Sequence, residues 1–429
     1  MDKAWRFETS VLHAGYEPDE HSRSVAVPIN LTAAFAFDST EHSVELFDGK
    51  VAGHIYTRIA NPTLQVLEQR IACLESGVGA TVTASGQAAV TAAVLTIAGG
   101  GDNIVAASSL YGTTFNLFAH TLAQYGVETR FAPYNEPEFF AKLIDHRTKA
   151  FFCESIANPA GHVPDISSLA NIAHENHIPL IVDNTVATPY LCRPIEHGAD
   201  IIVHSLTKYI SGHGIVLGGA VIDAGRFRWA DYPERFEKLS LPDEAHHRIS
   251  FTDRFGDRAY IARCASVPLR SLGAVLSPLN AFFILQGIET LPLRMDRICF
   301  NAEIICQFLE QHTAVSWVSY AASPAHPDHS RVKKYMRGKG SGVLSFGIRG
   351  GKEAGSRFHD AVKLIRRSVN IGDCKSLVCH PASTTHRQLS KEELIASGVT
   401  EDLVRLSIGT EHIQDLLSDI DQALVASQT

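Results

Sequence analysis

The sequence has 429 residues, of which 45% are hydrophobic and 20% charged, and its formal net charge is −8. This composition is typical of a soluble globular protein with two or three domains. The acidic balance argues against a nucleic-acid partner or an anionic membrane surface, and no apolar run reaches the ~18 residues of a membrane span.

The beginning of the chain and its cysteines predict a cytoplasmic protein. Residues 1–15 contain no basic segment followed by an apolar one, so no secretory signal is expected. The eight cysteines are scattered without a CxxC pair, which is typical of reduced thiols. The 21 histidines show no HExxH or other ligand spacing, so we expect no metal site.

The first part of the chain predicts an arm followed by a helix. Residues 1–62 have no strong periodicity and contain several prolines and glycines, which favours an extended arm with short helices. From residue 63 apolar side chains recur at helical spacing. A second, alanine-rich helix follows Ser85-Gly86-Gln87 and ends before three glycines, at 99–101.

The middle of the chain alternates between predicted strands and predicted helices. The strands cover 103–107, 150–153, 180–182 and the run from 201, and the helices cover about 114–125 and 166–177. Such alternation predicts a mostly parallel sheet with helical crossovers.

The last part predicts a smaller α+β layer. We interpret 223–260 as a surface excursion, and one long amphipathic helix from about 278 should lead to strands near 342–348 and 403–408. The predicted domains are therefore an arm (1–62), a large domain (63–277), and a connecting helix with a C-terminal domain (278–429).

Lys208 is the first candidate functional residue. It lies between a buried strand beginning at Ile201 and a second apolar run ending at Ile222. A buried ammonium must be paired or neutralised, and a Schiff base with an aldehyde cofactor is one neutralising chemistry. Ser205 and Thr207 flank the lysine and could hold a phosphate; the alternative is a loop lysine that reaches solvent.

Further candidates follow the other predicted strands. Ser85-Gly86-Gln87 begins a helix, where free N–H groups favour an anion, although a plain helix cap has the same pattern. Asp183 ends a strand and could hold a protonated pyridine nitrogen or cap a helix. Glu154 and Asn158 occupy a similar place one strand earlier, and Tyr111 could stack on a flat cofactor or simply line the rim.

Together these residues predict pyridoxal 5'-phosphate as cofactor. A phosphate cradle, a stacking ring, a strand-end aspartate and a lysine occur in this chain order. Rossmann GxGxxG, Walker GxxxxGK[ST] and GxSxG patterns are absent.

The sequence also resembles the Cys/Met-metabolism family of pyridoxal phosphate enzymes, of the cystathionine γ-synthase and γ-lyase type. The resemblance rests on YTRIANPT (56–63), ASGQAA (84–89), VDNTVATPYLCRPIEHGADIIVHSLTKYISGHG (182–214), KSLVCHPASTTH (375–386) and LVRLSIG (403–409). It implies the type I aminotransferase-like α/β fold. The length, the 223–260 segment and HPASTTHRQLS are most similar to members that act on O-acetylhomoserine with sulfide or methanethiol.

The resemblance implies roles for individual residues around the cofactor. Lys208 would form the Schiff base and move protons, Asp183 would pair with the ring nitrogen, Tyr111 would stack on the ring, and Asn158 would contact the ring hydroxyl. The remaining implied cofactor-binding residues are Ser85, Gly86, Gln87, Thr185, Ser205 and Thr207, with Tyr56 and Arg58 reaching the phosphate of a neighbouring subunit. A homotetramer built from dimers is expected.

For the substrate, the resemblance implies that Arg405, helped by Ser376 and Asn158, holds the α-carboxylate. Arg405 lies inside an apolar run, which by itself indicates an inward-facing, paired charge, and a guanidinium matches a carboxylate with two bonds. We expect His380 to be structural.

Three departures from the family pattern affect this expectation. Gln87 stands where many relatives have methionine, and IANPAGHVP after Glu154 is an uncommon version of its segment. Lys375 replaces an acid and could favour an anionic sulfur nucleophile, or could simply be solvated.

The expected reaction is γ-replacement on O-acetylhomoserine, which gives homocysteine with sulfide or methionine with methanethiol. O-succinylhomoserine as substrate and γ-elimination of the methionine γ-lyase type remain open, as does an inert pyridoxal phosphate-binding scaffold.

Overall fold

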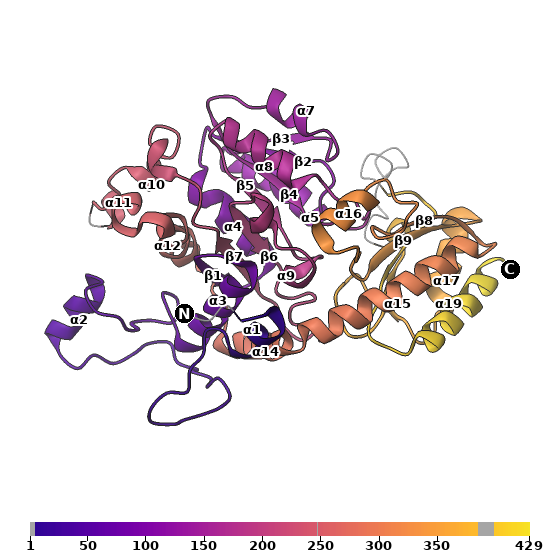
Figure 1. Cartoon of the computed structure of the whole chain (residues 1–429), viewed down its shortest axis with the longest axis horizontal. Helices are drawn as coiled ribbons and strands as arrows, with labels where there is room; N and C mark the ends of the chain where they lie inside the picture. Colours follow the sequence, from indigo (N-terminus) through magenta and orange to yellow (C-terminus); the bar gives the residue numbers. More distant parts are fainter. Residues whose placement is uncertain (1–4, 247, 385–398) are drawn as a thin grey trace.

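The computed structural model describes residues 5–246, 248–384 and 399–429. Within these ranges the chain forms a seven-stranded sheet and a five-stranded sheet, joined by a long helix, α15 (Leu291–Gln311). Figure 1 shows α15 running from the larger body to the C-terminal layer.

The larger sheet has the strand order β1-β7-β6-β5-β4-β2-β3. Its strands are β1 (Gly79–Thr83), β2 (Asn103–Ala107), β3 (Glu128–Ala132), β4 (Thr148–Glu154), β5 (Leu180–Asp183), β6 (Ile201–His204) and β7 (Gly219–Asp223). The pairs from β3 through β6 are parallel, while β7 is antiparallel to both β6 and β1. The predicted mostly parallel sheet is therefore confirmed.

Helices cover both faces of this sheet. They are α3 (Pro62–Glu75), α4 (Gly86–Ile97), α5 (Gly112–Asn116), α6 (Leu122–Gln124), α7 (Pro137–Lys142), α8 (Ile166–Glu175), α9 (Thr188–Leu191), α12 (Ala259–Cys264), α13 (Arg270–Leu272) and α14 (Pro278–Glu289). α3 packs against β1 and β7, α4 against β6 and β7, and α8 against β4 and β5. The central strands are buried on both faces, as their continuous apolar runs require.

The C-terminal layer is built on the second sheet, with the order β10-β11-β12-β9-β8. Its elements are β8 (Val315–Ser319), α16 (His329–Met336), β9 (Val343–Ile348), α17 (Gly351–Ala361), β10 (Arg366–Arg367), β11 (Leu377–Cys379), β12 (Leu403–Ser407) and α19 (Ile413–Ser427). The predicted α+β C-terminal part is found, with β8, β10 and β11 in addition.

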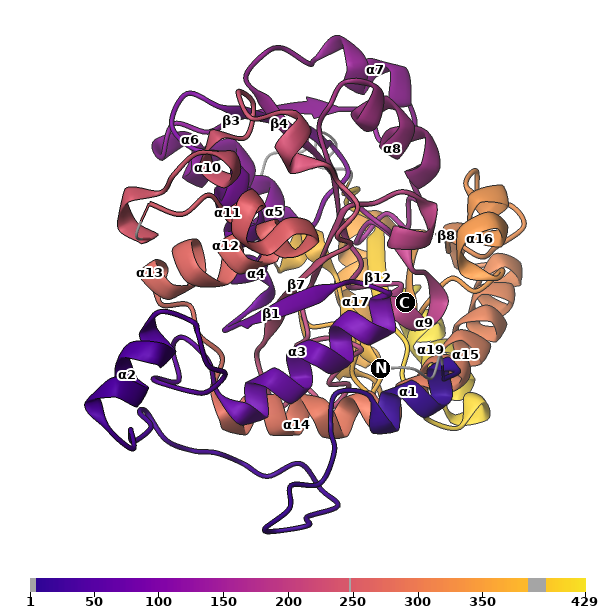
Figure 2. The same cartoon turned by 60° about the vertical axis from the view of Figure 1, so that its left-hand side comes forward.

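The amino-terminal residues contain two short helices and an extended segment. The helices are α1 (Phe7–His13) and α2 (Thr40–Phe47), and between α1 and α3 the chain extends away from the body (Figure 2).

Two segments differ from the prediction. Residues 223–260 are not merely a surface excursion, because they contain α10 (Glu237–Ser240) and α11 (Phe251–Phe255) and bury Trp229, Phe236 and Phe251 in the large core. The single helix predicted from 278 is two helices, α14 and α15, which meet at Thr290, because Pro292 favours a new helix start there.

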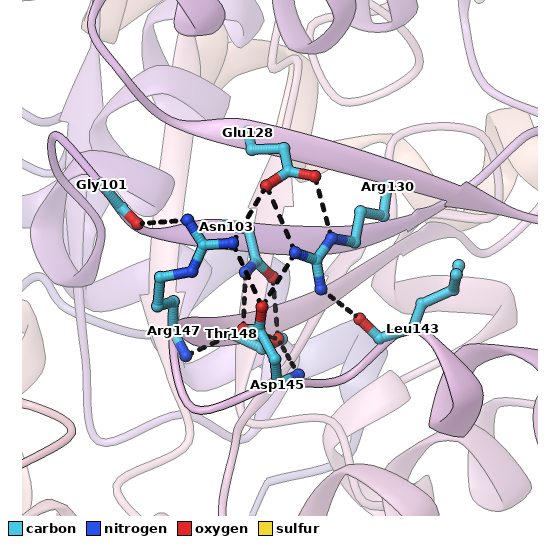
Figure 3. A network of polar contacts seen from close by, with 8 residues as sticks. All are labelled: Gly101, Asn103, Glu128, Arg130, Leu143, Asp145, Arg147 and Thr148. Atoms are coloured by element: carbon cyan, nitrogen blue, oxygen red, sulfur yellow. Dashed lines mark hydrogen bonds and ion pairs between the residues drawn. The ribbon is translucent and has the colours of Figure 1, made fainter.

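A polar network fixes the entry ends of β2, β3 and β4, opposite to the site described below. The Asp145 carboxylate accepts hydrogen bonds from Asn103 Nδ2 (2.8 Å), Arg130 Nη2 (2.8 Å) and Arg147 Nη2 (3.2 Å). Figure 3 shows these side chains converging on Asp145, with Glu128 contacting both arginines.

None of the helices in the described ranges combines the length and the hydropathy that crossing a bilayer requires.

Candidate active site

A pocket lies at the carboxyl ends of β4, β5 and β6, facing the beginning of α4. This is the edge at which parallel α/β sheets bind their ligands. Of the predicted residues, it is lined by Ser85, Gly86, Gln87, Tyr111, Asn158, Asp183, Thr185, Ser205, Thr207 and Lys208.

Lys208 projects into this pocket from the turn that follows β6. Its ammonium donates a hydrogen bond to the side-chain carbonyl of Asn370. Burial, with a further contribution from the positive charge of Arg405, lowers the pKa of Lys208 to about 8. About a tenth of the amine is therefore neutral at pH 7 and about half at pH 8, so the group is able to act as a nucleophile and in proton transfer.

Two carboxyl groups lie side by side on the pocket floor. Glu154 ends β4 and Asp183 ends β5, and the two residues are direct partners in the parallel register. Glu154 accepts from the backbone N–H of Tyr111 at 2.6 Å, and Asp183 accepts from the N–H of Thr185 at 2.9 Å. Burial raises the pKa of both groups, and for Glu154 the neighbouring Asp183 adds to the rise.

The backbone at the start of α4 lies very close to the segment that follows β6. Ser85 caps the helix, because its hydroxyl accepts from Ala88 N at 3.2 Å. A Cβ on Gly86 would lie only 2.6 Å from Ser205 Cβ, so a larger residue would not fit there. The side chain of Gln87 donates to Thr114 Oγ1 at 3.0 Å, which leaves backbone N–H groups to face the pocket.

The hydroxyls near Lys208 differ in whether they are already hydrogen-bonded within the protein. Thr185 Oγ1 accepts from Ser205 N at 2.8 Å and ties the ends of β5 and β6 together. The hydroxyl of Thr207 both donates to Gly218 O and accepts from Gly218 N, so it is already engaged within the protein. Among the pair that flanks the lysine, Ser205 is the better placed to donate a hydroxyl to a ligand.

Arg405 lies on β12 and is 8% exposed. Its Nη2 donates to the carbonyls of Val369 (2.8 Å) and Asn370 (3.2 Å), and its Nη1 donates to Asn158 Oδ1 at 3.4 Å. Its Nε is buried without a hydrogen-bond partner, and no ion pair joins it to an acid in the described ranges. Such a buried cation is well suited to receive a carboxylate.

Asn370 is a site residue that the sequence reasoning missed. It bridges the two cations, with its side chain on Lys208 and its backbone carbonyl on Arg405. Gly372 brings this segment against the lysine turn, because a Cβ there would lie 2.5 Å from Tyr209 N. A lone asparagine two residues before a glycine is too common a pattern to have revealed it.

Ser376 is not brought to the pocket. It is fully buried, and its N–H and hydroxyl both donate to Glu411 (2.6 and 2.8 Å), while Gly409 N donates to its hydroxyl at 2.8 Å. Lys375 is solvated, with a side chain 60% exposed and paired with Asp373 at 2.9 Å. Like Arg405, neither residue lines the pocket, but Arg405 contacts Asn158 of the lining, whereas Ser376 and Lys375 are engaged by Glu411 and Asp373.

Tyr56 and Arg58 lie outside this pocket and line a separate hollow on the arm. Arg58 lies over the Tyr56 ring at 5.3 Å and donates to the carbonyl of Arg270. His380 is fully buried and contacts Ser383 and the carbonyl of Glu401, as expected of a structural residue. Residues 385–398, which include the end of the HPASTTHRQLS motif, lie outside the described residues.

The donor set fits pyridoxal phosphate. Two adjacent carboxyl groups with raised pKa values and no ion pair in the described ranges would be stabilised by a protonated ring nitrogen beside Asp183. The helix start at Gly86 and Gln87 offers N–H groups to a phosphate, and Tyr111 is 45% exposed at the rim, where a ring can stack on it.

Comparisons with known proteins agree with this chemistry. Residues 8–425 match the family described as "Cys/Met metabolism PLP-dependent enzyme". The chain is 47% identical to Sulfhydrylase FUB7 of Fusarium oxysporum, with 97% of this chain and 96% of the relative aligned. It is 46% identical to O-acetyl-L-homoserine sulfhydrylase 1 of Thermus thermophilus, over 98% of this chain and all of the relative.

A solved structure gives the same result for the fold. The putative O-acetylhomoserine (thiol)-lyase of Campylobacter jejuni, which carries a pyridoxyl-lysine monophosphate, superposes with a TM-score of 0.95 at 39% identity. The alignment covers 98% of this chain and all of that one. The chain belongs to the Cys/Met-metabolism family of pyridoxal phosphate-dependent enzymes.

Proposed function

We propose that the protein is an O-acetyl-L-homoserine sulfhydrylase, which replaces the acetate of O-acetylhomoserine by sulfide to form homocysteine. Methanethiol in place of sulfide would give methionine. The proposal rests on two buried basic groups that Asn370 bridges. Arg405 is a guanidinium without an acidic partner in the described ranges, and Lys208 is an amine of lowered pKa.

Arg405 binds the α-carboxylate of the amino acid. Its Nε is an unsatisfied donor, and its Nη1 has only a long bond to Asn158, so a carboxylate gains hydrogen bonds that the free protein lacks. The substrate Cα is then held on the Lys208 side of the pocket. Asn158 remains a positioning group because it contacts Arg405 directly.

Lys208 moves the protons. Its neutral amine takes the proton from the substrate Cα, and the resulting ammonium returns protons after the γ-substituent has been exchanged. Pyridoxal phosphate, when bound, supplies the electron sink that makes the Cα and Cβ protons acidic. Acetate leaves Cγ with the bonding electron pair, and the sulfur of hydrosulfide forms the new bond at Cγ.

The remaining pocket wall favours an uncharged acyl group. Val369, Ile371 and Leu217 line the pocket, and Lys208 is the only basic side chain among its lining residues. A succinyl or phosphoryl group would bring a further negative charge against apolar side chains, which costs desolvation energy without a compensating partner. An acetyl group carries no such charge.

Product analysis tests the proposal. The purified protein, loaded with pyridoxal phosphate, should convert O-acetylhomoserine and sulfide into homocysteine and acetate in equal amounts. Without sulfide, acetate release should fall to a small fraction of that rate. Formation of 2-oxobutanoate and ammonia at the same rate with and without sulfide would identify γ-elimination instead.

We also propose that the active site is shared between subunits of a cytoplasmic homotetramer. Tyr56 and Arg58 lie on the arm, which extends from the body, and they do not line the pocket of their own chain. From this position they would reach the phosphate of a neighbouring subunit. The domain division at 62 and 277 remains a prediction.

A further inference from the structure

Arg294 is a second buried guanidinium, and the reaction described above does not use it. It lies in the first turn of α15 and is 7% exposed. Burial lowers its pKa, and in the described ranges no ion pair joins it to an acid. Burying a cation without a carboxylate partner costs desolvation energy, which other interactions must offset.

All the hydrogen bonds of Arg294 are directed at the Lys208 turn and at the junction of α14 and α15. Its Nη1 donates to the carbonyl of Tyr209 at 2.5 Å, and its Nη2 to the carbonyls of Ile210 (3.1 Å) and Gly287 (2.5 Å). Its Nε donates to Thr290 Oγ1 at 3.1 Å. Tyr209 and Ile210 directly follow Lys208, so the guanidinium holds the irregular backbone that carries the amine.

The surroundings are shaped to admit this side chain. A Cβ on Gly212 would lie 2.1 Å from Arg294 Nη1, and a Cβ on Gly287 would lie 2.3 Å from the carbonyl of Ser211. The turn after Lys208, the end of α14 and Arg294 therefore pack together without room for another atom. Such contact transmits a displacement of one part directly to the others.

The same helix supports the sheet that carries Arg405. Farther along, α15 packs against β8 and β9, and β9 pairs with β12 in the register Ser345–Arg405. Figure 1 shows α15 spanning from the large body to this layer. Arg294 thus connects the turn of the proton-moving amine to the helix behind the carboxylate-binding residue.

We propose that Arg294 is a positioning residue, which fixes the turn carrying Lys208 relative to the helix that supports Arg405. It touches neither substrate nor cofactor. It acts by holding two backbone carbonyls of the lysine turn, so that the amine reaches the Cα of a substrate whose carboxylate is bound on Arg405. A misplacement of about 1 Å between reacting groups can cost about a hundredfold in rate.

The test compares Arg294→Lys with Arg297→Lys, in protein loaded with pyridoxal phosphate. Arg297 lies on the same helix but is exposed and contacts Phe300. Arg294→Lys should lower kcat about tenfold or more while KM for O-acetylhomoserine changes less than about threefold. Arg297→Lys should match the parent in both constants.

A second readout does not depend on turnover. The pH titration of the visible absorption of the bound cofactor reports on the environment of Lys208. A loosened turn exposes the amine to water, so in Arg294→Lys the midpoint of this titration should move to higher pH, while in Arg297→Lys it stays. The unfolding temperature of each loaded variant is measured alongside.

Parental kcat and an unmoved midpoint in folded Arg294→Lys would overturn the proposal, even if its unfolding temperature falls. Should Arg294→Lys fail to fold, Thr290→Val decides, because it preserves the side-chain shape and removes the acceptor of Nε together with only a long hydrogen bond (3.4 Å) from that hydroxyl to the Gly287 carbonyl. It should show a smaller change of kcat and midpoint in the same direction, and parental values would overturn the proposal. The inference rests on the proposed role of Lys208: if the parent does not act on O-acetylhomoserine, the proposed function fails, whereas the titration still decides the role of Arg294.

Discussion

Glu154 and Asp183 are neighbours at the carboxyl ends of two parallel strands, and the pKa of each carboxyl group is raised. Burial is the main cause for both, and the charge of Asp183 adds to the rise for Glu154. Two adjacent buried carboxyl groups do not both ionise readily, because each negative charge disfavours the other. Both line the pocket, but Glu154 accepts from two backbone N–H groups, those of Tyr111 and Asn158, whereas Asp183 accepts from the backbone N–H of Thr185 and has more capacity left to meet a cation.

The two carboxyl groups should therefore respond differently to amidation. Glu154→Gln keeps the neutral form of this side chain, so kcat and cofactor retention should stay within about threefold of the parent. Asp183→Asn removes the carboxylate that would pair with a protonated ring nitrogen, and kcat should fall about a hundredfold or more. Steady-state kinetics and cofactor retention on gel filtration measure both. A larger loss in Glu154→Gln than in Asp183→Asn would exchange the two assignments.

The pKa of Lys208 predicts how the cofactor-free protein captures pyridoxal phosphate. The neutral amine is the nucleophile, so the rate of capture should rise with pH through about 8, where the ordinary lysine value would place the rise near 10.5. Arg405→Met removes a positive charge that disfavours the ammonium, and the midpoint should therefore move upward. Stopped-flow absorption across a pH series measures the midpoint. A downward shift in Arg405→Met would contradict the electrostatic account.

Several parts of this site could be predicted from the sequence, because short local segments determine them. Asp183 and Lys208 follow short apolar runs that become buried strands, and the edge of a parallel sheet brings such residues together without further information. The helix start at Gly86 is equally local, because capping needs only Ser85 and its own helix.

The parts that were not predicted depend on packing between distant segments. Asn370 reaches Lys208 because Gly372 packs against Tyr209, a contact that no periodicity records. From the sequence we expected Ser376, six residues further on, to help hold the substrate carboxylate. Its hydroxyl donates to Glu411 instead. The strands β1, β3, β8, β10 and β11 were not predicted, because β10 and β11 have only two and three residues and the other three mix polar with apolar residues. The buried aromatic residues of 223–260 lie among charged ones in the sequence.

Asn370 and Ser376 can be separated by substitution. Asn370→Asp places a carboxylate beside Lys208 and Arg405, where it competes with the substrate, so KM for O-acetylhomoserine should rise about tenfold or more. Ser376→Ala should leave KM within about twofold, yet lower the free energy of unfolding by about 1–3 kcal/mol, because Glu411 and Gly409 lose a buried partner. Kinetics and urea unfolding check both. The reverse outcome, a tenfold rise of KM in stable Ser376→Ala, would place this serine at the substrate carboxylate.

Asp145 links stability to pH. Burial raises its pKa, but hydrogen bonds from Asn103, Arg130 and Arg147 outweigh that effect and hold the pKa well below its ordinary value. A lowered pKa means that the charged form stabilises the folded state, and this stabilisation is complete above the unfolded-state pKa of about 3.9 and disappears as the pH falls below it. Asp145→Asn should thus be about 1–2 kcal/mol less stable than the parent near pH 7.

The difference between the parent and Asp145→Asn should shrink in unfolding measurements below about pH 4. Asp360→Asn serves as control, because the Asp360 side chain is 74% exposed and should show no such difference. If the difference in unfolding free energy between the parent and Asp145→Asn became larger at acidic pH, the lowered pKa of Asp145 would be contradicted.

Subunit sharing predicts complementation. Lys208→Ala should abolish turnover, and Arg58→Ala should weaken the binding of the phosphate of the neighbouring subunit. In a mixed dimer one site receives intact Lys208 from one chain and intact Arg58 from the other, so random exchange should restore about a quarter of the parental activity. Activity after co-refolding the two variants measures this. Activity no higher than the average of the separate variants would place Arg58 at the site of its own chain or at none.

The most direct measurement of the central claim is a competition for the acyl group. Equal concentrations of O-acetylhomoserine and O-succinylhomoserine are offered to the loaded enzyme with excess sulfide, and the acetate and succinate released are counted together. The apolar wall around Val369 and Ile371 predicts a ratio of at least about ten in favour of acetate, since a second carboxylate would lie there without a partner. Equal release, or an excess of succinate, would contradict the proposed substrate.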